Sequence, residues 1–536
     1  MAFLEAVKLI CNRCTKARRA CLGYKPVTDL IFRTQRFDRG HTLPVAQQLS
    51  LNNSHRETVL TQRPPAPILA EWHTIEFEQT ARDFFLQDYC IVPSDPSLSR
   101  GYLDGLPRLV EHYGPSSELS RVLTIVALAS YGNKYRRPEV AEKAKILYFE
   151  LLQSFRSSIL DVRSSNIVAS LMTAVLLGLY EIISTHDSTS AAHSTHTRGV
   201  CALLSSSHSP FDIHTGAQVF QMANPLRLNS AQLQQSSSSF GILCAPVSSH
   251  PVQTLDSILL KASSLHEKMQ RLMDAPTIVP ADDVHAVREE IMLIAEEYAR
   301  WPQNQPSEWS PKTVGFADIT QPDSNTSSIC WPGKVEGYFD LYVSAVWNSY
   351  RKARLLYLDR VIQFEEHFRQ DARRFDVHPT DLPTYYPTNE IPLQPLLSQM
   401  QDLAIDIAAS VPFHLTNSGK SWQFSQGETA ALFTPGRSVG GLLLLHPLGV
   451  ASKRSTLSPD LRAYFRKCLA WIAAHMGIGQ AAIFAKVRHI PTSVNGGLDM
   501  APMYSLTLFQ DIDELPLGFI KDGHALVWAG MLISQT

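Results

Sequence analysis

The sequence contains no apolar run as long as the roughly 18 residues that a membrane-spanning helix needs. The closest run, at 167–179, is interrupted by Ser170, Thr173 and Gly178. Residues 1–10 are too short for a secretory signal and include charged side chains. We therefore expect a soluble, intracellular protein that has no membrane partner.

Cysteine is also scarce. The eight cysteines among 536 residues are Cys11, Cys14, Cys21, Cys90, Cys201, Cys244, Cys330 and Cys468. A secreted disulfide scaffold would be shorter and denser in cysteine. The five cysteines outside the N-terminal group are scattered, and we expect free, mostly buried thiols in a reducing compartment.

Charge of one sign is missing overall but not locally. Charged residues make up 18% of the chain and the net charge is −2, so nothing attracts the whole molecule to nucleic acid. Residues 1–40, however, hold nine Lys/Arg against three Asp/Glu and net +6, whereas the remaining 39 against 47 net −8. This asymmetry predicts a polyanionic partner for the N-terminal head alone.

Motifs of the common enzyme classes are absent. We find no phosphate-binding Gly-x-x-x-x-Gly-Lys-Ser/Thr, no suitably placed Gly-x-Gly-x-x-Gly and no Gly-x-Ser-x-Gly. His186, His193 and His196 crowd one Ser/Thr-rich stretch, but a catalytic zinc pair is normally presented from rigid structure with a further ligand. We therefore expect a protein that is not an enzyme and has no catalytic residues.

Hydrophobic spacing indicates an all-α fold. Apolar residues recur at helical intervals from about residue 75, and sustained strand alternation is missing. A run such as Phe77, Ala81, Phe84, Phe85 and Tyr89 is typical of one helix face. The predicted helices lie at 75–89, 138–159, 167–183, 255–273, 282–301, 337–368, 393–411 (ending before Pro412), 440–450 and 458–476.

The most specific feature is Cys11-x-x-Cys14, followed after six residues by Cys21. Cys-x-x-Cys places two thiolates on one turn, where they can share a metal ion, and a third can close over the same site. The basic residues between them are Arg13, Lys16, Arg18 and Arg19. Cations favour the thiolate form and also offer contacts to phosphate. Three free thiols in a basic tail remain the alternative on spacing alone.

The adjoining residues extend this pattern. The stretch CNRCTKARRACLGY at 11–24, with Asp29, Phe32 and Arg33 beyond it, resembles the C-terminal half of the fungal two-zinc, six-cysteine cluster. In that family the half-cluster runs Cys-x-x-Cys, six residues, Cys, and then commonly Gly-Tyr, an aspartate and Phe-Arg. The resemblance implies zinc as cofactor, with Cys11, Cys14 and Cys21 as ligands and the intervening basic side chains at DNA.

The first half of that cluster is not present, since only ten residues precede Cys11 and none is cysteine. In the family six thiolates hold two zinc ions, which three ligands cannot do. The other half also carries the short basic helix that reads base edges in the major groove. We therefore expect weakened or lost DNA binding. A start codon placed too late, a short isoform or a decayed head each explains the pattern.

The rest of the chain resembles the fungal-specific regulatory domain of the same family over roughly 75–490. The landmarks are Leu176–Glu181, His196–Gly199, Leu203–Leu204, Trp347–Arg351, Ser410–Phe413 and Met476–Ala481. We interpret them as core architecture, with Glu181 a buried or capped acid that could pair with His196 or Arg198. The aromatic stripe is interpreted as core too, with an effector pocket as the alternative: Tyr338, Tyr342, Trp347, Tyr350 and Tyr357.

The predicted domains are a partial zinc-cluster segment at 1–24, a linker at 25–75, the regulatory domain at 76–490 and a C-terminal segment at 491–536. Breaker-rich TQRPPAP lies in the linker, and a Ser/Gln-rich break near 205–255 interrupts the regulatory domain. The linker shows no sustained heptads, so a coiled-coil homodimer is not supported there.

The resemblance implies a nuclear transcription factor that regulates RNA polymerase II genes, plausibly a metabolic or secondary-metabolite set. Its partners would be promoter DNA, a homodimer mate, and a small-molecule effector or the transcription machinery. The alternative is a regulatory or interaction protein of the same family that has lost independent DNA binding.

The genomic sequence upstream of Met1 separates these two hypotheses. For the DNA-binding regulator we expect an in-frame Cys-x-x-Cys, six residues, Cys ahead of it. Absence of that triplet, together with no specific retention of DNA by the zinc-supplied chain, would leave the interaction protein.

Overall fold

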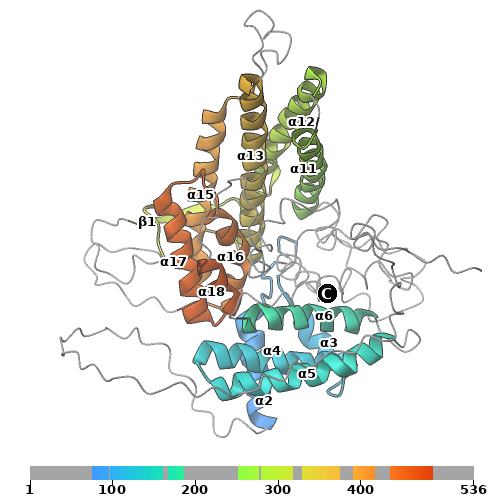
Figure 1. The fold of residues 1–536 in the computed structure, drawn as a ribbon. Helices are drawn as coiled ribbons and strands as arrows, with labels where there is room; N and C mark the ends of the chain where they lie inside the picture. The colour runs from blue at the N-terminus through green and yellow to red at the C-terminus, as the bar shows by residue number, and fades with distance from the viewer. Residues whose placement is uncertain are drawn as a thin grey trace, which may run out of the picture. The chain divides into compact units, whose positions relative to one another are not determined.

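The computed structural model describes residues 75–95, 97–99, 101–160, 167–185, 251–276, 279–317, 329–374, 390–416 and 435–486. The chain divides into two units, 1–60 and 61–536, and every described residue lies in the second. The described part is built from twelve α-helices and one two-stranded sheet, which confirms the all-α class (Figure 1). None of its helices is both long and apolar enough to cross a bilayer.

The first group of helices is built around one buried helix. It comprises α2 (Ile75–Tyr89), α3 (Leu106–Tyr113), α4 (Glu118–Tyr135), α5 (Pro138–Leu160) and α6 (Ile167–Ser184). Helix α4 packs against α2, α5 and α6, and its residues from 119 to 132 are buried except Arg121. Ser117 caps its N-terminus by accepting from the Ser120 amide, and Arg136 ends it in the left-handed conformation at φ 55°.

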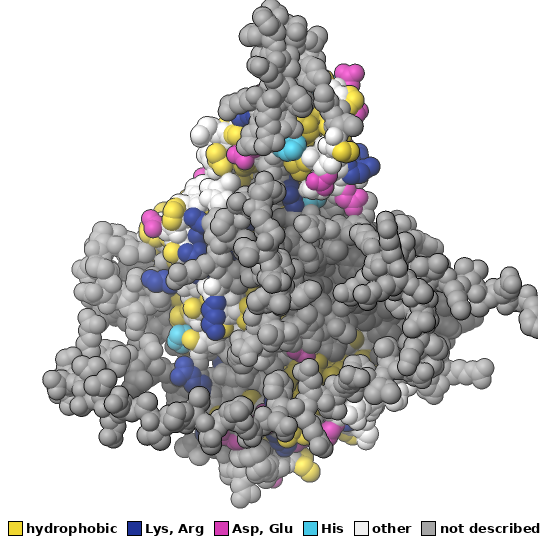
Figure 2. Space-filling view, in the orientation of Figure 1, with side chains coloured by type: hydrophobic (Ala, Val, Ile, Leu, Met, Phe, Trp, Pro, Cys, Tyr) yellow, Lys and Arg dark blue, Asp and Glu magenta, His cyan; other side chains and the backbone are white. Residues whose placement is uncertain are grey.

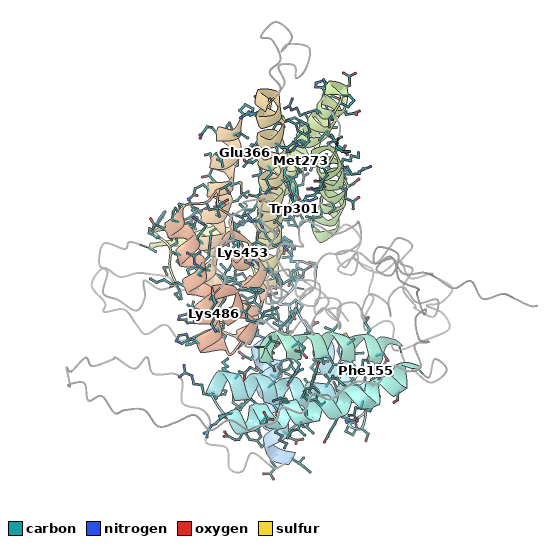
Figure 3. All side chains as sticks on the ribbon, in the orientation of Figure 1. Phe155, Met273, Trp301, Glu366, Lys453 and Lys486 are labelled. Carbon is teal, nitrogen blue, oxygen red and sulfur yellow. The ribbon has the colours of Figure 1, made fainter. Side chains whose placement is uncertain are left out.

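The second group surrounds the long helix α13 (Leu341–Arg374). Helices α11 (Pro251–Met273), α12 (Ala281–Arg300) and α15 (Leu393–Leu415) complete this group, and α13 contacts α11 and α15. Two 3₁₀ turns follow α12, at Trp301–Asn304 and Ser307–Trp309. Trp301 stacks on Tyr350 of α13 at a ring distance of 4.8 Å, which joins the end of α12 to α13. Figure 3 labels Trp301, which lies beside α13.

The third group consists of α16 (Ser438–Ala451), α17 (Pro459–Met476) and α18 (Gly479–Lys486). Helix α16 is buried over its whole length, between α13, α15 and α17. A Cβ on Gly440 would meet the His414 carbonyl oxygen at 2.0 Å, so this position requires glycine for the start of α16 to approach the end of α15.

Two local expectations were wrong. No strand was predicted between the helices expected at 282–301 and 337–368, but strands β1 (Lys312–Ala317) and β2 (Gly333–Gly337) form an antiparallel pair with an irregular register between Thr313 and Gly315. Both strands are short. Because β1 is largely exposed, its sequence lacks the alternation of apolar and polar residues that marks a half-buried strand. Consequently the long helix begins at Leu341 rather than at residue 337.

Helix α15 also runs through Pro412, where the sequence predicted its end. A proline removes one helical hydrogen bond, but the next turn holds the buried residues His414 and Leu415. Their burial favours a continued helix over a break.

A buried ion pair supplies a test of this packing. Arg288 of α12 donates two hydrogen bonds of 2.9 Å to Glu365 of α13, and both side chains are at most 5% exposed. We expect Glu365→Ala to lower the free energy of unfolding by about 3–5 kcal/mol, because a buried guanidinium loses its partner. Chemical denaturation would measure the loss.

Two further variants control this experiment. Arg288→Met combined with Glu365→Leu should recover most of the loss, because no charge is left buried without a partner. Glu142→Ala, which breaks the exposed pair with Lys145, should change stability by less than about 0.5 kcal/mol. Equal losses for the Glu142 and Glu365 variants would contradict the argument.

Candidate functional site

The predicted metal and DNA residues all lie outside the described part of the chain. They are Cys11, Cys14, Cys21, Arg13, Lys16, Arg18 and Arg19. Their roles therefore stay predictions. Within the described ranges, no group of three or more His, Cys, Asp or Glu is placed to hold a metal ion. The described cysteines Cys90, Cys330 and Cys468 are free and buried, as expected, and burial raises the pKa of each to about 12.

The acid at the end of α6 is confirmed as a core residue. Glu181 is 9% exposed and accepts a hydrogen bond of 2.5 Å from the Tyr148 hydroxyl of α5. Thr185 provides a second donor at 3.3 Å. Burial raises the pKa of Glu181. The suggested partners His196 and Arg198 lie outside the described residues.

The later landmarks come together in one buried polar network. Arg351 of α13 donates to Glu336 of β2 at 2.8 Å and to the Tyr338 hydroxyl at 2.6 Å. Tyr338 in turn donates to Glu336 at 2.5 Å. Asn348 donates to Ser410 of α15 at 2.9 Å. The residues of Trp347–Arg351 and Ser410–Phe413 therefore hold β2, α13 and α15 in register, which confirms the architectural interpretation.

His414 carries this network on to α16. Its Nε2 lies 2.7 Å from the Ser344 hydroxyl and its Nδ1 lies 3.2 Å from the Gly440 carbonyl oxygen. Burial lowers the pKa of His414 to about 3, so the ring is neutral at physiological pH. Because a carbonyl can only accept, Nδ1 carries the proton and Nε2 accepts from Ser344. The start of α16 is thereby fixed against α13 and α15.

The aromatic stripe of α13 is core, with one exception. Tyr342, Trp347, Tyr350 and Tyr357 are each at most 7% exposed, whereas Tyr338 is only half-buried. The effector pocket considered for this stripe is therefore filled by packing.

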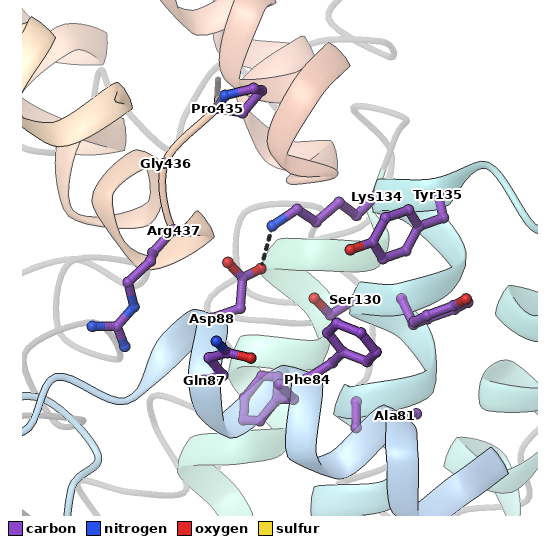
Figure 4. A pocket seen from close by; sticks show the side chains of 13 residues that line it. Ala81, Phe84, Gln87, Asp88, Ser130, Lys134, Tyr135, Pro435, Gly436 and Arg437 are labelled. Carbon is purple, nitrogen blue, oxygen red and sulfur yellow. Dashed lines mark hydrogen bonds and ion pairs between the residues drawn. The ribbon is translucent and has the colours of Figure 1, made fainter. Parts of the chain in front are cut away.

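A cavity of about 190 Å³ lies elsewhere, between α2, α4 and the segment that leads into α16 (Figure 4). Its lining residues are Ala81, Phe84, Phe85, Gln87, Asp88, Ala127, Ser130, Tyr131, Lys134, Tyr135, Pro435, Gly436 and Arg437. The chain thus brings together three stretches that are up to about 350 residues apart. Helix spacing places Phe84 and Asp88 of α2 on one face, and Tyr131 and Tyr135 of α4 on another.

Asp88 joins the three walls of this cavity. One carboxylate oxygen lies 2.7 Å from the Lys134 ammonium of α4, and the other accepts from the Ser438 amide at 2.8 Å. A carboxylate at the N-terminus of α16 is also favoured by the helix dipole. Arg437 donates to the backbone carbonyl of Cys90 just after α2. In Figure 4 Arg437 lies on the opposite side of Asp88 from Lys134.

A glycine closes the same junction from α17. Gly477 ends α17 at φ 72°, and a Cβ there would meet the Lys134 amide nitrogen at 2.5 Å. The Met476–Ala481 landmark is therefore the place where α17 turns into α18 against the end of α4.

Comparison with curated proteins finds transcription factor dbaG of Emericella nidulans, 33% identical over 457 residues, which cover 85% of this chain and 96% of that relative. The chain belongs to the family of this fungal transcription factor. No protein-family model matches the chain, and no solved structure matches it.

In this transcription factor the cavity residues are the ones that sequence reasoning missed. Phe84 was expected on a helix face. Asp88, Lys134 and Arg437 belong to no sequence motif, because they are distant in sequence and their residue types are common. Only a method that pairs distant positions could have found them.

The described body of this transcription factor also has a basic flank. Lys and Arg side chains follow one another over α17 and α18, on the left of the view in Figure 2. We define the basic flank as Arg462, Arg466, Lys467 and Lys486; Asp460 is the only acidic residue within α17 and α18. The surface there favours anionic partners.

The Asp88 junction gives a direct prediction. We expect Asp88→Ala to lower the free energy of unfolding by about 1–3 kcal/mol, because the Ser438 amide and Lys134 both lose a charged partner. Asp83→Ala is the matched control, since Asp83 lies on the same helix, is exposed and, within the described ranges, accepts a side-chain hydrogen bond from Gln79 alone. Denaturation curves with equal midpoints for the two variants would contradict the role given to Asp88.

Proposed function

We propose that this fungal transcription factor is a zinc-cluster regulator that acts in the nucleus on RNA polymerase II genes. The observation that carries the proposal is the 33% identity to transcription factor dbaG over 85% of the chain and 96% of that relative. A shared length of this extent favours a shared type of protein, a non-enzymatic regulator with a large helical body.

The head supports the DNA-binding half of the proposal by its charge and its cysteines. Residues 1–40 net +6, which suits a phosphate backbone, and Cys11, Cys14 and Cys21 match the ligand positions of the half-cluster. Zinc bound there would hold the basic residues Arg13, Lys16, Arg18 and Arg19 near the phosphates. Contacts of this kind position a protein on DNA and carry no sequence information by themselves.

Control of a metabolic or secondary-metabolite gene set is the finer part of the proposal, and it rests on the family resemblance. Comparing transcripts between a strain that lacks the gene and its parent would test it. We expect the affected genes to include a contiguous metabolic cluster. Unchanged transcripts under conditions in which the protein accumulates would reject this part.

The second candidate is a regulatory protein that does not bind DNA on its own. The basic flank favours it, because four cations on α17 and α18 form a contact surface for an acidic partner that is independent of the head. In this case another protein would bring the helical body to the promoter.

Binding to promoter DNA distinguishes the two candidates. For the DNA-binding regulator, we expect the purified chain with zinc to retain genomic fragments weakly, with an affinity that falls as the salt concentration rises. Replacing both Arg18 and Arg19 by alanine should weaken binding about equally across sequences and reduce the salt slope by about 2.

The double variant Arg462→Ala, Lys467→Ala serves as the matched control, since it removes two cations from the body. Loss of DNA retention in the Arg18/Arg19 variant alone supports the DNA-binding regulator. Equal retention by all three proteins, or retention by none of them, rejects a DNA-binding head and leaves the second candidate.

A further inference from the structure

We propose that the cavity between α2, α4 and residues 435–437 binds a small aromatic acid, that is, one ring that carries a carboxylate. The inference rests on the proposed regulatory function only for its biological meaning, as an effector site. The binding itself depends on the geometry of the cavity.

The size of the cavity suits a ligand of one ring. Its volume is about 190 Å³. An apolar cavity of about 150 Å³ accommodates benzene, whereas drug-sized ligands occupy pockets of about 300–1,000 Å³. One ring with one small substituent therefore fits.

The walls of the cavity suit an aromatic body. Phe84, Tyr131 and Tyr135 surround one side, with ring distances of 6.0 Å between Phe84 and Tyr131 and 4.7 Å between Tyr131 and Tyr135. Their interplanar angles of 56° and 46° leave ring faces and edges turned to different directions. A planar ring can pack against such a wall by offset or edge-to-face contact.

The charge at the other side of the cavity selects an anion. Lys134 and Arg437 contribute two cations to the lining against the single carboxylate of Asp88. Arg437 is half-buried and donates to the Cys90 backbone carbonyl. Burial lowers the pKa of Arg437, and the nearby Asp88 carboxylate offsets this lowering only in part. A ligand carboxylate would offset this excess positive charge.

Two uncharged groups are available to orient the ligand. The Tyr135 hydroxyl points, in Figure 4, toward the side of the cavity where Asp88 and Lys134 lie. Burial raises the pKa of Tyr135 and the nearby Asp88 raises it further, so the hydroxyl keeps its proton and can donate it to a ligand oxygen. The exposed Gln87 also lines the cavity. Neither side chain has a hydrogen-bond partner among the described residues.

The position of the cavity explains how a bound ligand would affect the packing of other helices. It lies where α2 and α4 meet the N-terminus of α16, and α16 is fixed to α13 and α15 through Gly440 and His414. A ligand that contacts both Tyr135 and Arg437 would therefore stiffen the connection between the first and third helix groups.

Titration calorimetry of the full chain with benzoate tests the proposal. We expect saturable binding at one site with a dissociation constant on the order of 0.1–1 mM, as suits so small a ligand. Benzamide, which has the ring without the charge, and cyclohexanecarboxylate, which has the charge without the aromatic ring, should each bind at least about tenfold more weakly.

Variants place the binding in this cavity. Tyr135→Phe keeps the ring and removes only the hydroxyl, so we expect benzoate to bind about fivefold more weakly with the unfolding midpoint nearly unchanged. Phe84→Ala should weaken binding by about tenfold or more, because it removes one aromatic wall. Phe149→Ala is the matched control, since Phe149 is an exposed aromatic residue of α5 outside the cavity.

The proposal is overturned if benzoate shows no saturable binding, if benzamide binds as tightly as benzoate, or if neither cavity variant differs from the Phe149 variant. These results do not depend on DNA. Failure of the promoter experiment with normal benzoate binding would reject the DNA-binding function alone, and the reverse result would reject the cavity site alone.

Discussion

The pairing of buried charges along α13 is the constraint on which the rest of the described structure depends. This 34-residue helix carries Arg351, Asp359 and Glu365 into the interior. Each finds its partner on a different element: Glu336 on β2, Arg454 just after α16, and Arg288 on α12. A buried charge is tolerated only when it is paired. A shift of α13 along any one of these neighbours would therefore break an ion pair and leave a buried charge without a partner.

Lys352 is an exception to this rule. It lies on the same helix and is 6% exposed, yet no carboxylate among the described residues lies within ion-pair distance. Burial lowers its pKa to about 7, so the ammonium loses its proton easily instead of finding a partner. The register of α13 is therefore set by the paired residues Arg351, Asp359 and Glu365, and not by Lys352.

The contacts of α13 also fix the wall of the cavity that precedes α16. His414 is neutral and bridges Ser344 of α13 to the Gly440 carbonyl of α16, so the start of α16 cannot shift without breaking a buried hydrogen bond. The residues just before and at that start, Arg437 and Ser438, then reach Cys90 and Asp88 of the first helix group. The cavity is therefore held open by backbone and carboxylate contacts that depend on the packing behind them.

Sequence patterns predicted the helices well where one face is apolar, and less well where tertiary contacts decide. The spacing in 75–89 and 167–183 agrees with α2 and α6. Helix α15 continues past Pro412 because His414 and Leu415 are buried in the next turn, and burial of this kind is invisible in local sequence. The two-stranded sheet was not predicted because its strands, 312–317 and 333–337, are separated in sequence and show little alternation of apolar and polar residues.

The candidate sites divide in the same way. A covalent spacing such as Cys11-x-x-Cys14 is local, so it can be recognised from the sequence even though its structure lies outside the described residues. Asp88, Lys134 and Arg437 acquire meaning only when three distant segments fold together. Their residue types are common and they match no motif, so the sequence alone does not indicate a site at these positions.

The extent of the family match decides which part of the chain the family shares. The match covers 457 of 536 residues, which leaves 536 − 457 = 79 unmatched, so residues 1–74 cannot account for it. At least 457 − 74 = 383 of the matched residues therefore lie in 75–536, the part of the chain that holds every described helix.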